Sequence, residues 1–206
     1  YTELVNKGFY VDGHPGGIHL MLYVIVKLFG NSAAVIRLPF VIFGILSVYV
    51  LYRLVRLWIG PHAALLTALS LSLLQFPLLY SRIARPYGSG LFFCLLAALV
   101  WTHFQLVLKS KNSSPGKLPL YSFLYALANA LCMYNHYFSF LMALIMGITL
   151  FFMVPFRRSL WIILSGMVSS LLFLPHLKIT LNHLSLGGVG QWLAKPGPDF
   201  LFEHIF

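Results

Sequence analysis

The sequence predicts an all-α protein, a polytopic bundle of about six membrane-spanning helices with short interfacial helices. Hydrophobic residues make up 60% of the 206 residues and charged residues only 9%, and the mean hydropathy is +0.87. Apolar stretches recur at close to the roughly 20 residues that an α-helix needs to cross a bilayer. These observations exclude a soluble domain, which would need more polar surface.

Basic residues outnumber acidic ones, with 14 Lys and Arg against 4 Asp and Glu. Nucleic-acid binding would explain such an excess, but the basic residues stand singly or in pairs at the ends of apolar runs and form no stripe. Membrane topology explains this distribution better. Cys94 and Cys132 lie inside apolar runs, which indicates packing positions rather than a disulfide framework or a cysteine metal site.

Six apolar runs, bounded by charged residues, Gly and Pro, are predicted to span the membrane. In chain order they cover residues 37–58, 62–81, 87–108, 119–135, 138–155 and 160–176. A shorter apolar stretch at 16–30 follows Pro15, a residue that favours the start of a helix. We expect this stretch to lie at the membrane interface.

The whole chain, 1–206, is predicted to be a single transmembrane domain. Residues 1–36 form an outer loop with the interfacial helix, 37–176 hold the six spans, and 177–206 form a second outer loop rich in Gly and Pro. The chain begins at Tyr1 without a signal-like segment and stops at Phe206, so we interpret it as a fragment of a longer protein.

Six alternating crossings sort the loops to two sides of the membrane. The loops at 53–62, 109–118 and 155–159 carry Lys and Arg but no acidic residue, which predicts that they face the cytoplasm. All four acidic residues fall on the opposite side. The polar chemistry is therefore expected on the face away from the cytoplasm.

Two arginines lie on this outer face in YSRIARPYGSG, residues 80–90. An arginine beside hydrocarbon is costly and usually paired, and a guanidinium matches a phosphate with two parallel hydrogen bonds. If RIAR is the last turn of a helix, Arg82 and Arg85 share one face, and the helix stops at Ala84 or Arg85 because Pro86 follows. The pair indicates either an anion site or two side chains that reach the membrane interface.

Asp12 and His14 lie in VDGHPGG, residues 11–17, just before the interfacial helix. Asp12 is a candidate general base or metal ligand, and His14 a candidate to orient a phosphate or an acid. The alternative is ordinary helix-start chemistry, with a polar cap before Pro15. A metal bound by Asp12, His14 and His136 is a further alternative, although no two of them have a spacing that signals a metal site.

Asn135 and His136, in YNHYF, separate two apolar spans. They are candidates for substrate contact, and the alternative is that they satisfy free amides and carbonyls at helix ends. The LPH segment, 174–176, and Lys195 are further candidates on the outer face.

Four segments form a recognisable combination: GHPGGIHLMLYVIVKLFGNSAAVIRLPFVIFGILSVYVLYRLVRLWIG, YSRIARPYGSGL, YNHYFSFL and FLPHL. This combination resembles glycosyltransferase family 39, which includes protein O-mannosyltransferases and the lipid A aminoarabinose transferase, all with the GT-C fold. The resemblance covers nearly the whole chain. It implies a membrane enzyme that moves a sugar from a polyprenyl-phosphate carrier to an acceptor on the non-cytoplasmic face.

The resemblance also implies roles for particular residues. His14 and Pro15 match the family's His-Pro, and Arg85 with Tyr87 match its Arg-x-Tyr, which is associated with the carrier phosphate. The family's catalytic carboxylate is usually an Asp-Glu pair upstream of the His-Pro, so Asp12 is a stand-in and the true base is expected before Tyr1. Gly16 stands where members usually have a second Pro. The predicted substrate-binding residues are His14, Arg82, Arg85, Tyr87, His136 and Lys195.

The implied chemistry fits these residue types. Arginine charge beside the carrier phosphate stabilises negative charge as the glycosidic bond breaks, and a carboxylate deprotonates the acceptor hydroxyl for in-line attack with inversion. We therefore expect no cofactor, with a divalent metal as the alternative.

The expected partners are the lipid-linked donor, membrane lipids and a lipid, polysaccharide or protein acceptor, and no nucleic acid. The expected location is a bacterial inner membrane, with the active face outward. Two other classes stay open. They are a transporter or flippase of a lipid-linked anion, whose usual repeated halves this sequence does not show, and a non-catalytic membrane subunit.

Overall fold

The computed structural model describes residues 8–10, 13–110, 114, 116–185, 197 and 199. All regular structure within these residues is helical, so the predicted all-α class is confirmed. The α-helices are α1 (Gly17–Phe29), α2 (Ala33–Trp58), α3 (Pro61–Leu73), α4 (Gln75–Tyr80), α5 (Pro86–Lys109), α6 (Lys117–Asn135), α7 (Tyr137–Met153), α8 (Ser159–Phe173) and α9 (Leu177–Ser185). Two short 3₁₀ segments, η2 (Phe156–Arg158) and η3 (Leu174–His176), flank α8.

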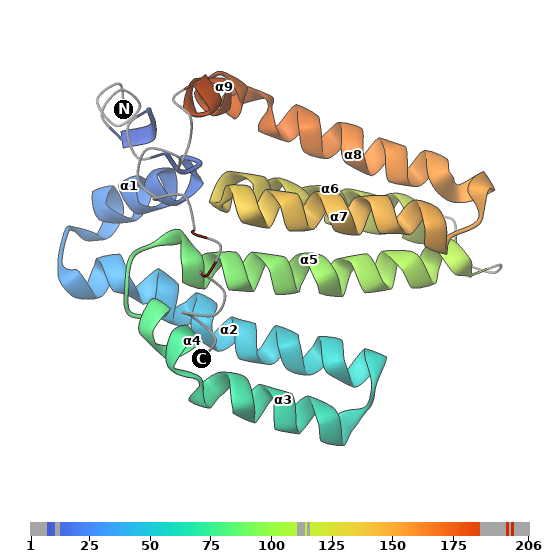
Figure 1. Cartoon of the computed structure of the whole chain (residues 1–206), viewed down its shortest axis with the longest axis horizontal. Coiled ribbons are helices and arrows are strands. Elements are labelled where there is room, and N and C mark those ends of the chain that lie inside the picture. Colours follow the sequence, from blue (N-terminus) through green and yellow to red (C-terminus); the bar gives the residue numbers. More distant parts are fainter. Residues whose placement is uncertain are drawn as a thin grey trace.

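The long helices run side by side as a bundle with α5 at its centre (Figure 1). Helix α5 packs on α2 and α6, α6 also packs on α7 and α8, and α3 lies against α2. Small side chains, including Ala97, Ala98, Ala128, Cys132 and Ala143, form the core where these helices meet. Small residues let helix backbones approach closely, which is the usual basis of helix association in a membrane.

Three helical runs within the described residues are long and apolar enough to cross a membrane: Ala33–Trp58, Pro86–Lys109 and Phe156–Ser185. The other predicted spans correspond to α3 with α4, to α6 and to α7, of which α3 and α7 are shorter apolar helices. The membrane helical bundle is thus confirmed, while the count of six crossings stays a prediction.

The second predicted span, 62–81, is not one helix. Helix α3 ends at Leu73, Leu74 is extended with φ −65° and ψ 135°, and α4 begins at Gln75. Pro77 explains the break, because a proline has no N–H and its ring clashes with the carbonyl four residues earlier, that of Leu73. Starting a new helix at Gln75 moves Pro77 into a first turn, where a missing N–H costs little.

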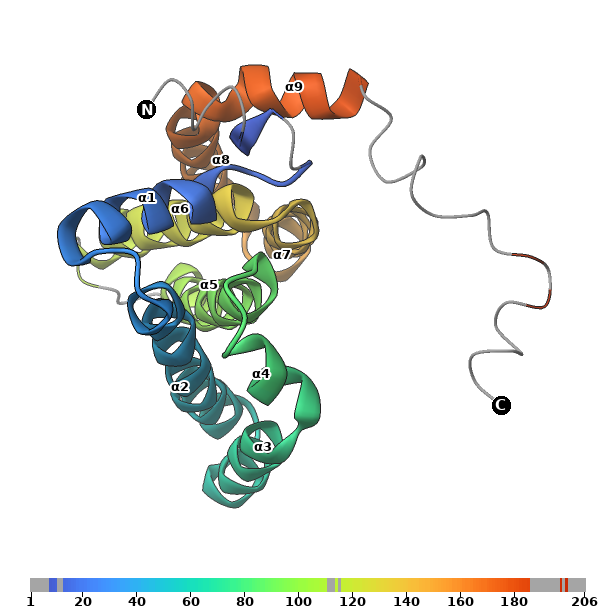
Figure 2. The ribbon, with the colours of Figure 1, turned by 90° about the vertical axis from the view of Figure 1, so that its left-hand side faces the viewer.

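Two helices lie across one end of the bundle rather than along it. Figure 2, which looks onto that end, shows α1 and α9 crossing it, whereas α5 to α8 point toward the viewer. Helix α1 begins at Gly17, just after Pro15, as the sequence predicted. We call this the α1 end, which also holds the α4–α5 and α6–α7 junctions. The opposite end holds the α2–α3, α5–α6 and α7–α8 junctions (Figure 1).

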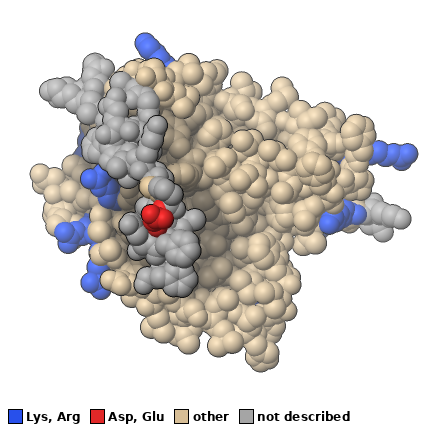
Figure 3. Space-filling view, viewed as in Figure 1, with Lys and Arg blue, Asp and Glu red and all other residues tan. Residues whose placement is uncertain are grey.

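Charged side chains gather at the two ends of the molecule. On the face drawn in Figure 3, Lys and Arg lie at both ends and the surface between them is uncharged. Large apolar side chains are exposed along the helices, among them Leu66 in α3, Leu141 in α7 and Met167 in α8. An exposed apolar belt between charged ends is the surface that a bilayer covers.

Candidate functional site

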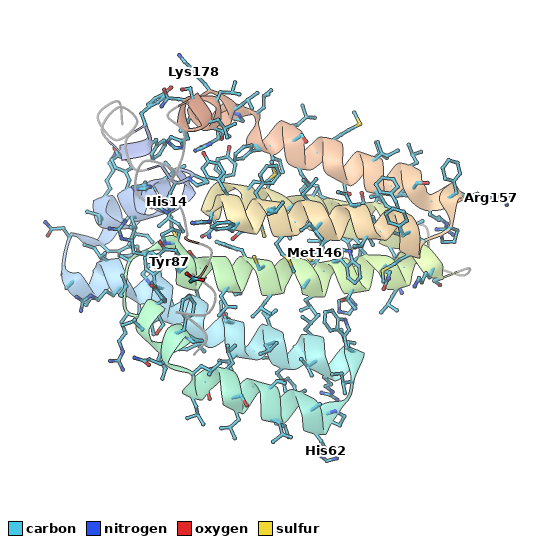
Figure 4. All side chains as sticks on the ribbon, in the orientation of Figure 1. His14, His62, Tyr87, Met146, Arg157 and Lys178 are labelled. Atoms are coloured by element: carbon cyan, nitrogen blue, oxygen red, sulfur yellow. The ribbon has the colours of Figure 1, made fainter. Side chains whose placement is uncertain are left out.

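Three rings from separate elements come together at the α1 end. His14 lies in the loop before α1, Tyr87 in the first turn of α5, and His136 between α6 and α7. The ring centroids of His14 and His136 are 5.1 Å apart, and those of Tyr87 and His136 are 5.9 Å apart. Figure 4 shows His14 and Tyr87 at this end and Arg157 and His62 at the opposite one. We call His14, Tyr87 and His136 the ring cluster.

The start of α5 fixes the position of Tyr87. Arg85 is extended, with φ −126° and ψ 155°, as expected of a residue before proline, and Pro86 occupies the first turn of α5. The ring of Tyr80, at the end of α4, lies 4.9 Å from the ring of Tyr87. Gly88 allows this approach, because a Cβ there would lie 2.8 Å from the carbonyl oxygen of Tyr80.

Arg82 and Arg85 lie in the turn between α4 and α5, and both are exposed. The expectation that RIAR forms the last turn of a helix is wrong, because α4 already ends at Tyr80. The turn is closed by a bond from the backbone N–H of Arg85 to the carbonyl of Ile83, at 2.8 Å. The two arginines therefore lie on the turn that leads into α5 and Tyr87, rather than on one helix face.

Asn135 ties the end of α6 to the first turn of α5. Its side-chain amide donates to the carbonyl of Pro86 at 2.8 Å, and its Oδ1 accepts from the hydroxyl of Ser89 at 2.6 Å. The side chain is only 1% exposed. Gly90 makes room for it, since a Cβ at that position would lie 2.9 Å from the Asn135 amide nitrogen. Asn135 therefore sets the start of α5, with Arg85 and Tyr87, against His136.

His136 caps the first turn of α7. Its Nδ1 accepts from the backbone N–H of Phe138 at 3.1 Å, which assigns the ring proton of the neutral form to Nε2. Burial, followed by the nearby His14, lowers the pKa of His136 below its usual value. The helix-end role weighed from the sequence is confirmed, and the ring also remains part of the cluster.

The loop that carries His14 is bonded to the far end of the chain. The backbone N–H of Gly16 donates to Nε2 of His176, in η3, at 2.8 Å. His183, in α9, lies with Nε2 2.6 Å from the carbonyl oxygen of Phe9 and Nδ1 2.7 Å from the hydroxyl of Tyr137. Both histidines are buried. The LPH segment thus lies at this end, as expected, but its histidine contacts the backbone of the loop.

Gly16, which stands where the resemblance led us to expect a second proline, has a clear structural use. A proline has no N–H, so it could not make the bond to His176. A Cβ at this position would also lie 2.8 Å from the ring of Phe9. The glycine lets the loop approach both neighbours.

Two predicted site residues, Asp12 and Lys195, lie outside the residues that the structure describes. The metal alternative included Asp12 with His14 and His136, of which the structure places the two imidazoles together. Within the described part of the chain, no three His, Cys, Asp or Glu residues form a group able to hold a metal ion.

Sequence reasoning missed His183 and the bonds made by Asn135 and His176. Asn135 was named only as a candidate for a helix end or substrate contact. The one local signal was that these polar residues stand at the ends of apolar helices.

Comparison with protein families decides the class of this chain. Residues 13–179 match the family model described as dolichyl-phosphate-mannose-protein mannosyltransferase. The chain belongs to this family. The match begins at the loop that carries His14 and ends within α9, so it covers every residue of the ring cluster.

Membership in the mannosyltransferase family makes the chain a membrane glycosyltransferase that uses a lipid-linked sugar. It also agrees with the resemblance to GT-C membrane glycosyltransferases drawn from the sequence. Neither the curated proteins nor the solved structures provided a match.

Proposed function

We propose that the chain transfers a sugar from a polyprenyl-phosphate carrier to an acceptor on the non-cytoplasmic side of the membrane, with the ring cluster and the α4–α5 turn as the donor site. The observation that carries this proposal is the convergence of His14, Tyr87 and His136 beside the turn with Arg82 and Arg85. Charged, hydroxyl and imidazole groups thus meet at one end of an apolar bundle.

The carrier phosphate is assigned to the arginine side of this site. Arg85 precedes the first turn of α5, and its guanidinium can offer two parallel N–H donors to a phosphate. Positive charge there stabilises the phosphate as the bond to the sugar breaks. Arg82, on the same exposed turn, adds to the positive potential that attracts an anionic donor.

The rings provide hydrogen-bonding groups for the sugar. Tyr87 is 41% exposed and has a hydroxyl that can donate or accept. Neutral His136 keeps an N–H at Nε2, because its Nδ1 is bonded to the backbone. Asp12 remains the candidate base that removes the proton from the hydroxyl of the acceptor. The acceptor oxygen then attacks the sugar carbon in line with the departing carrier phosphate, with inversion at that carbon.

The proposal includes a location. The membrane is proposed to be a bacterial inner membrane, with the ring cluster on its outer face. The positive-inside rule supports this orientation, because the basic junctions lie at the opposite end. The acceptor is a lipid, polysaccharide or protein hydroxyl, and no resident cofactor takes part in the proposed reaction.

Photolabelling with a polyprenyl-phosphate sugar tests the donor site. Purified protein is irradiated with a photoreactive analogue, and labelling is compared among wild type, Arg85→Ala and Arg157→Ala. Arg157 is the matched control, an exposed arginine in η2 at the opposite end. Labelling is expected to fall at least about tenfold for Arg85→Ala, since a charge-assisted phosphate contact contributes more than 1.4 kcal/mol, and to be unchanged for Arg157→Ala. Equal labelling of all three proteins would overturn the assignment.

A further inference from the structure

Two buried histidines near the end of the described helices hold the backbone of a segment near its beginning. His176 is 3% and His183 5% exposed. His176 bonds the backbone of Gly16, and His183 bonds the backbone of Phe9, so the two contacts lie on either side of His14. We propose that these two bonds, which we call the histidine clasp, position His14 in the ring cluster, so that His176 and His183 are positioning residues of the donor site.

The bonds of the clasp require His176 to be neutral and place a proton on one ring nitrogen of each histidine. Nε2 of His176 accepts from an amide, so the ring proton is on Nδ1, which donates to the hydroxyl of Thr180 at 3.0 Å. In His183 the proton is on Nε2, because this nitrogen faces the carbonyl of Phe9, and a carbonyl can only accept a hydrogen bond. Its Nε2–H donates to the carbonyl of Phe9, and its Nδ1 is hydrogen-bonded to the hydroxyl of Tyr137. Each ring nitrogen therefore has one partner.

The clasp limits where the intervening backbone can go. Gly16 is held by His176, and the next residue, Gly17, lies so close to α6 that a Cβ would be 2.5 Å from the carbonyl oxygen of Tyr134. Pro15 is fully buried. His14 is therefore only two residues from a fixed point on one side and five from Phe9 on the other.

The elements that hold the clasp also hold the other side of the cluster. Tyr137, which bonds His183, directly follows His136 in the chain. Tyr134 packs its ring against that of His176, with centroids 5.6 Å apart, and precedes His136 by two residues. The same junction between α6 and α7 thus places His136 and supports the loop of His14. A change in the clasp is expected to shift the two imidazoles relative to each other.

One part of this inference, the effect of the clasp on donor binding, rests on the proposed function. The position of the loop can be measured separately, by amide hydrogen exchange in the peptide that contains Gly16. The comparison uses wild type, His176→Phe, His176→Gln and His62→Phe in the same detergent. Phenylalanine fills the volume without an acceptor, whereas glutamine keeps an oxygen that can accept the Gly16 N–H. His62, exposed at the opposite end, is the matched control.

For His176→Phe we expect exchange about fivefold faster at the amide of Gly16, since losing one hydrogen bond costs about 1 kcal/mol. Donor photolabelling should fall in parallel. The glutamine variant should restore most of the protection and of the labelling, and His62→Phe should match wild type. Unchanged exchange in His176→Phe, or equally fast exchange in the Phe and Gln variants, would overturn the clasp.

A second variant covers the outcome in which His176→Phe does not fold. Tyr137→Phe removes only the hydroxyl that orients His183, and it should speed exchange in the peptide that contains Tyr10 while leaving that of α8 unchanged. Unchanged exchange there would contradict the role of His183. If exchange changes as expected but no protein is labelled by the donor, the clasp stands and the proposed function fails.

Discussion

The two ends of the molecule carry polar bonds of different kinds. At the α1 end, Asn135 bonds the start of another helix and His176 bonds a loop 160 residues away in sequence. At the opposite end, Arg53 bonds the hydroxyl of Tyr49 and Arg56 that of Tyr52, each four residues earlier on α2. The first kind of bond fixes loops relative to one another. The second kind lies within a single helix, although the opposite end also has a bond between helices, from the indole N–H of Trp58 in α2 to the hydroxyl of Thr102 in α5.

This contrast teaches that positive charge alone does not distinguish the two ends of this chain. Both ends carry exposed arginines. Among the residues that the structure describes, the α1 end combines them with buried imidazole and amide groups that join separate elements. We therefore expect changes at the α1 end to affect both stability and donor binding, and changes at the opposite end to affect stability alone.

Gly17→Ala, compared with a matched glycine substitution at the opposite end, should give the largest difference in stability and donor labelling. The new Cβ would lie 2.5 Å from the carbonyl oxygen of Tyr134, a backbone atom that cannot move without shifting α6. Overpacking of this kind costs about 2–3 kcal/mol, and donor labelling should be lost. Gly116→Ala, at the opposite end with no atom within 4 Å of its Cβ, is the control. Thermal unfolding in detergent measures both, and equal unfolding midpoints would contradict the close packing of α1 on α6.

Asn135→Leu should have the next largest effect. It leaves the carbonyl of Pro86 without its amide partner, at a cost of about 1–2 kcal/mol. Donor labelling should fall because the start of α5 is no longer held. Thr102→Val is the matched control at the opposite end, where Thr102 is 5% exposed and accepts from the indole N–H of Trp58. Comparable destabilisation with equal loss of labelling in both variants would remove the contrast.

A pH effect on His136 should be smaller. Because its pKa is lowered in the folded protein by burial and by His14, the unfolded chain takes up a proton at higher pH, near the ordinary value of about 6.5. The stability contributed by the neutral ring is present above that pH and is lost as the pH falls toward the folded value. The unfolding midpoint of wild type should drop more between pH 7.5 and 5 than that of His136→Asn. Parallel slopes would show that His136 does not titrate differently on folding.

Tyr49→Phe should have the smallest effect. It removes the hydroxyl that accepts from Arg53 at 2.8 Å, an exposed bond within one helix. Such bonds contribute about 0.5 kcal/mol or less, so the unfolding midpoint should barely change and donor labelling should equal that of wild type. A marked loss of labelling would mean that the opposite end also contributes to donor binding.

The sequence predicted the helices well where local physics decides. Apolar runs located the long helices, and Pro86 fixed the start of α5 because the residue before a proline avoids the helical region. The break at Leu74 was missed although Pro77 signalled it, since the apolar run continues through it.

The site was predictable only in part. His14, Tyr87 and His136 were named from motifs, and the structure brings them together. The partner of His176 was not predictable, because a bond between residues 160 apart leaves no pattern in the neighbouring sequence. The same holds for the bond between Asn135 and Pro86, which depends on how α5 and α6 pack.

The histidine clasp also has a consequence for the order in which the protein is made. The Gly16 and Phe9 contacts lie 160 and 174 residues from their histidines along the chain. The segment that holds Phe9 and Gly16 is made before α9 and must therefore wait for that helix before it can adopt its final position. During that interval the bundle can insert helix by helix, but the proposed donor site stays incomplete until α9 has been made.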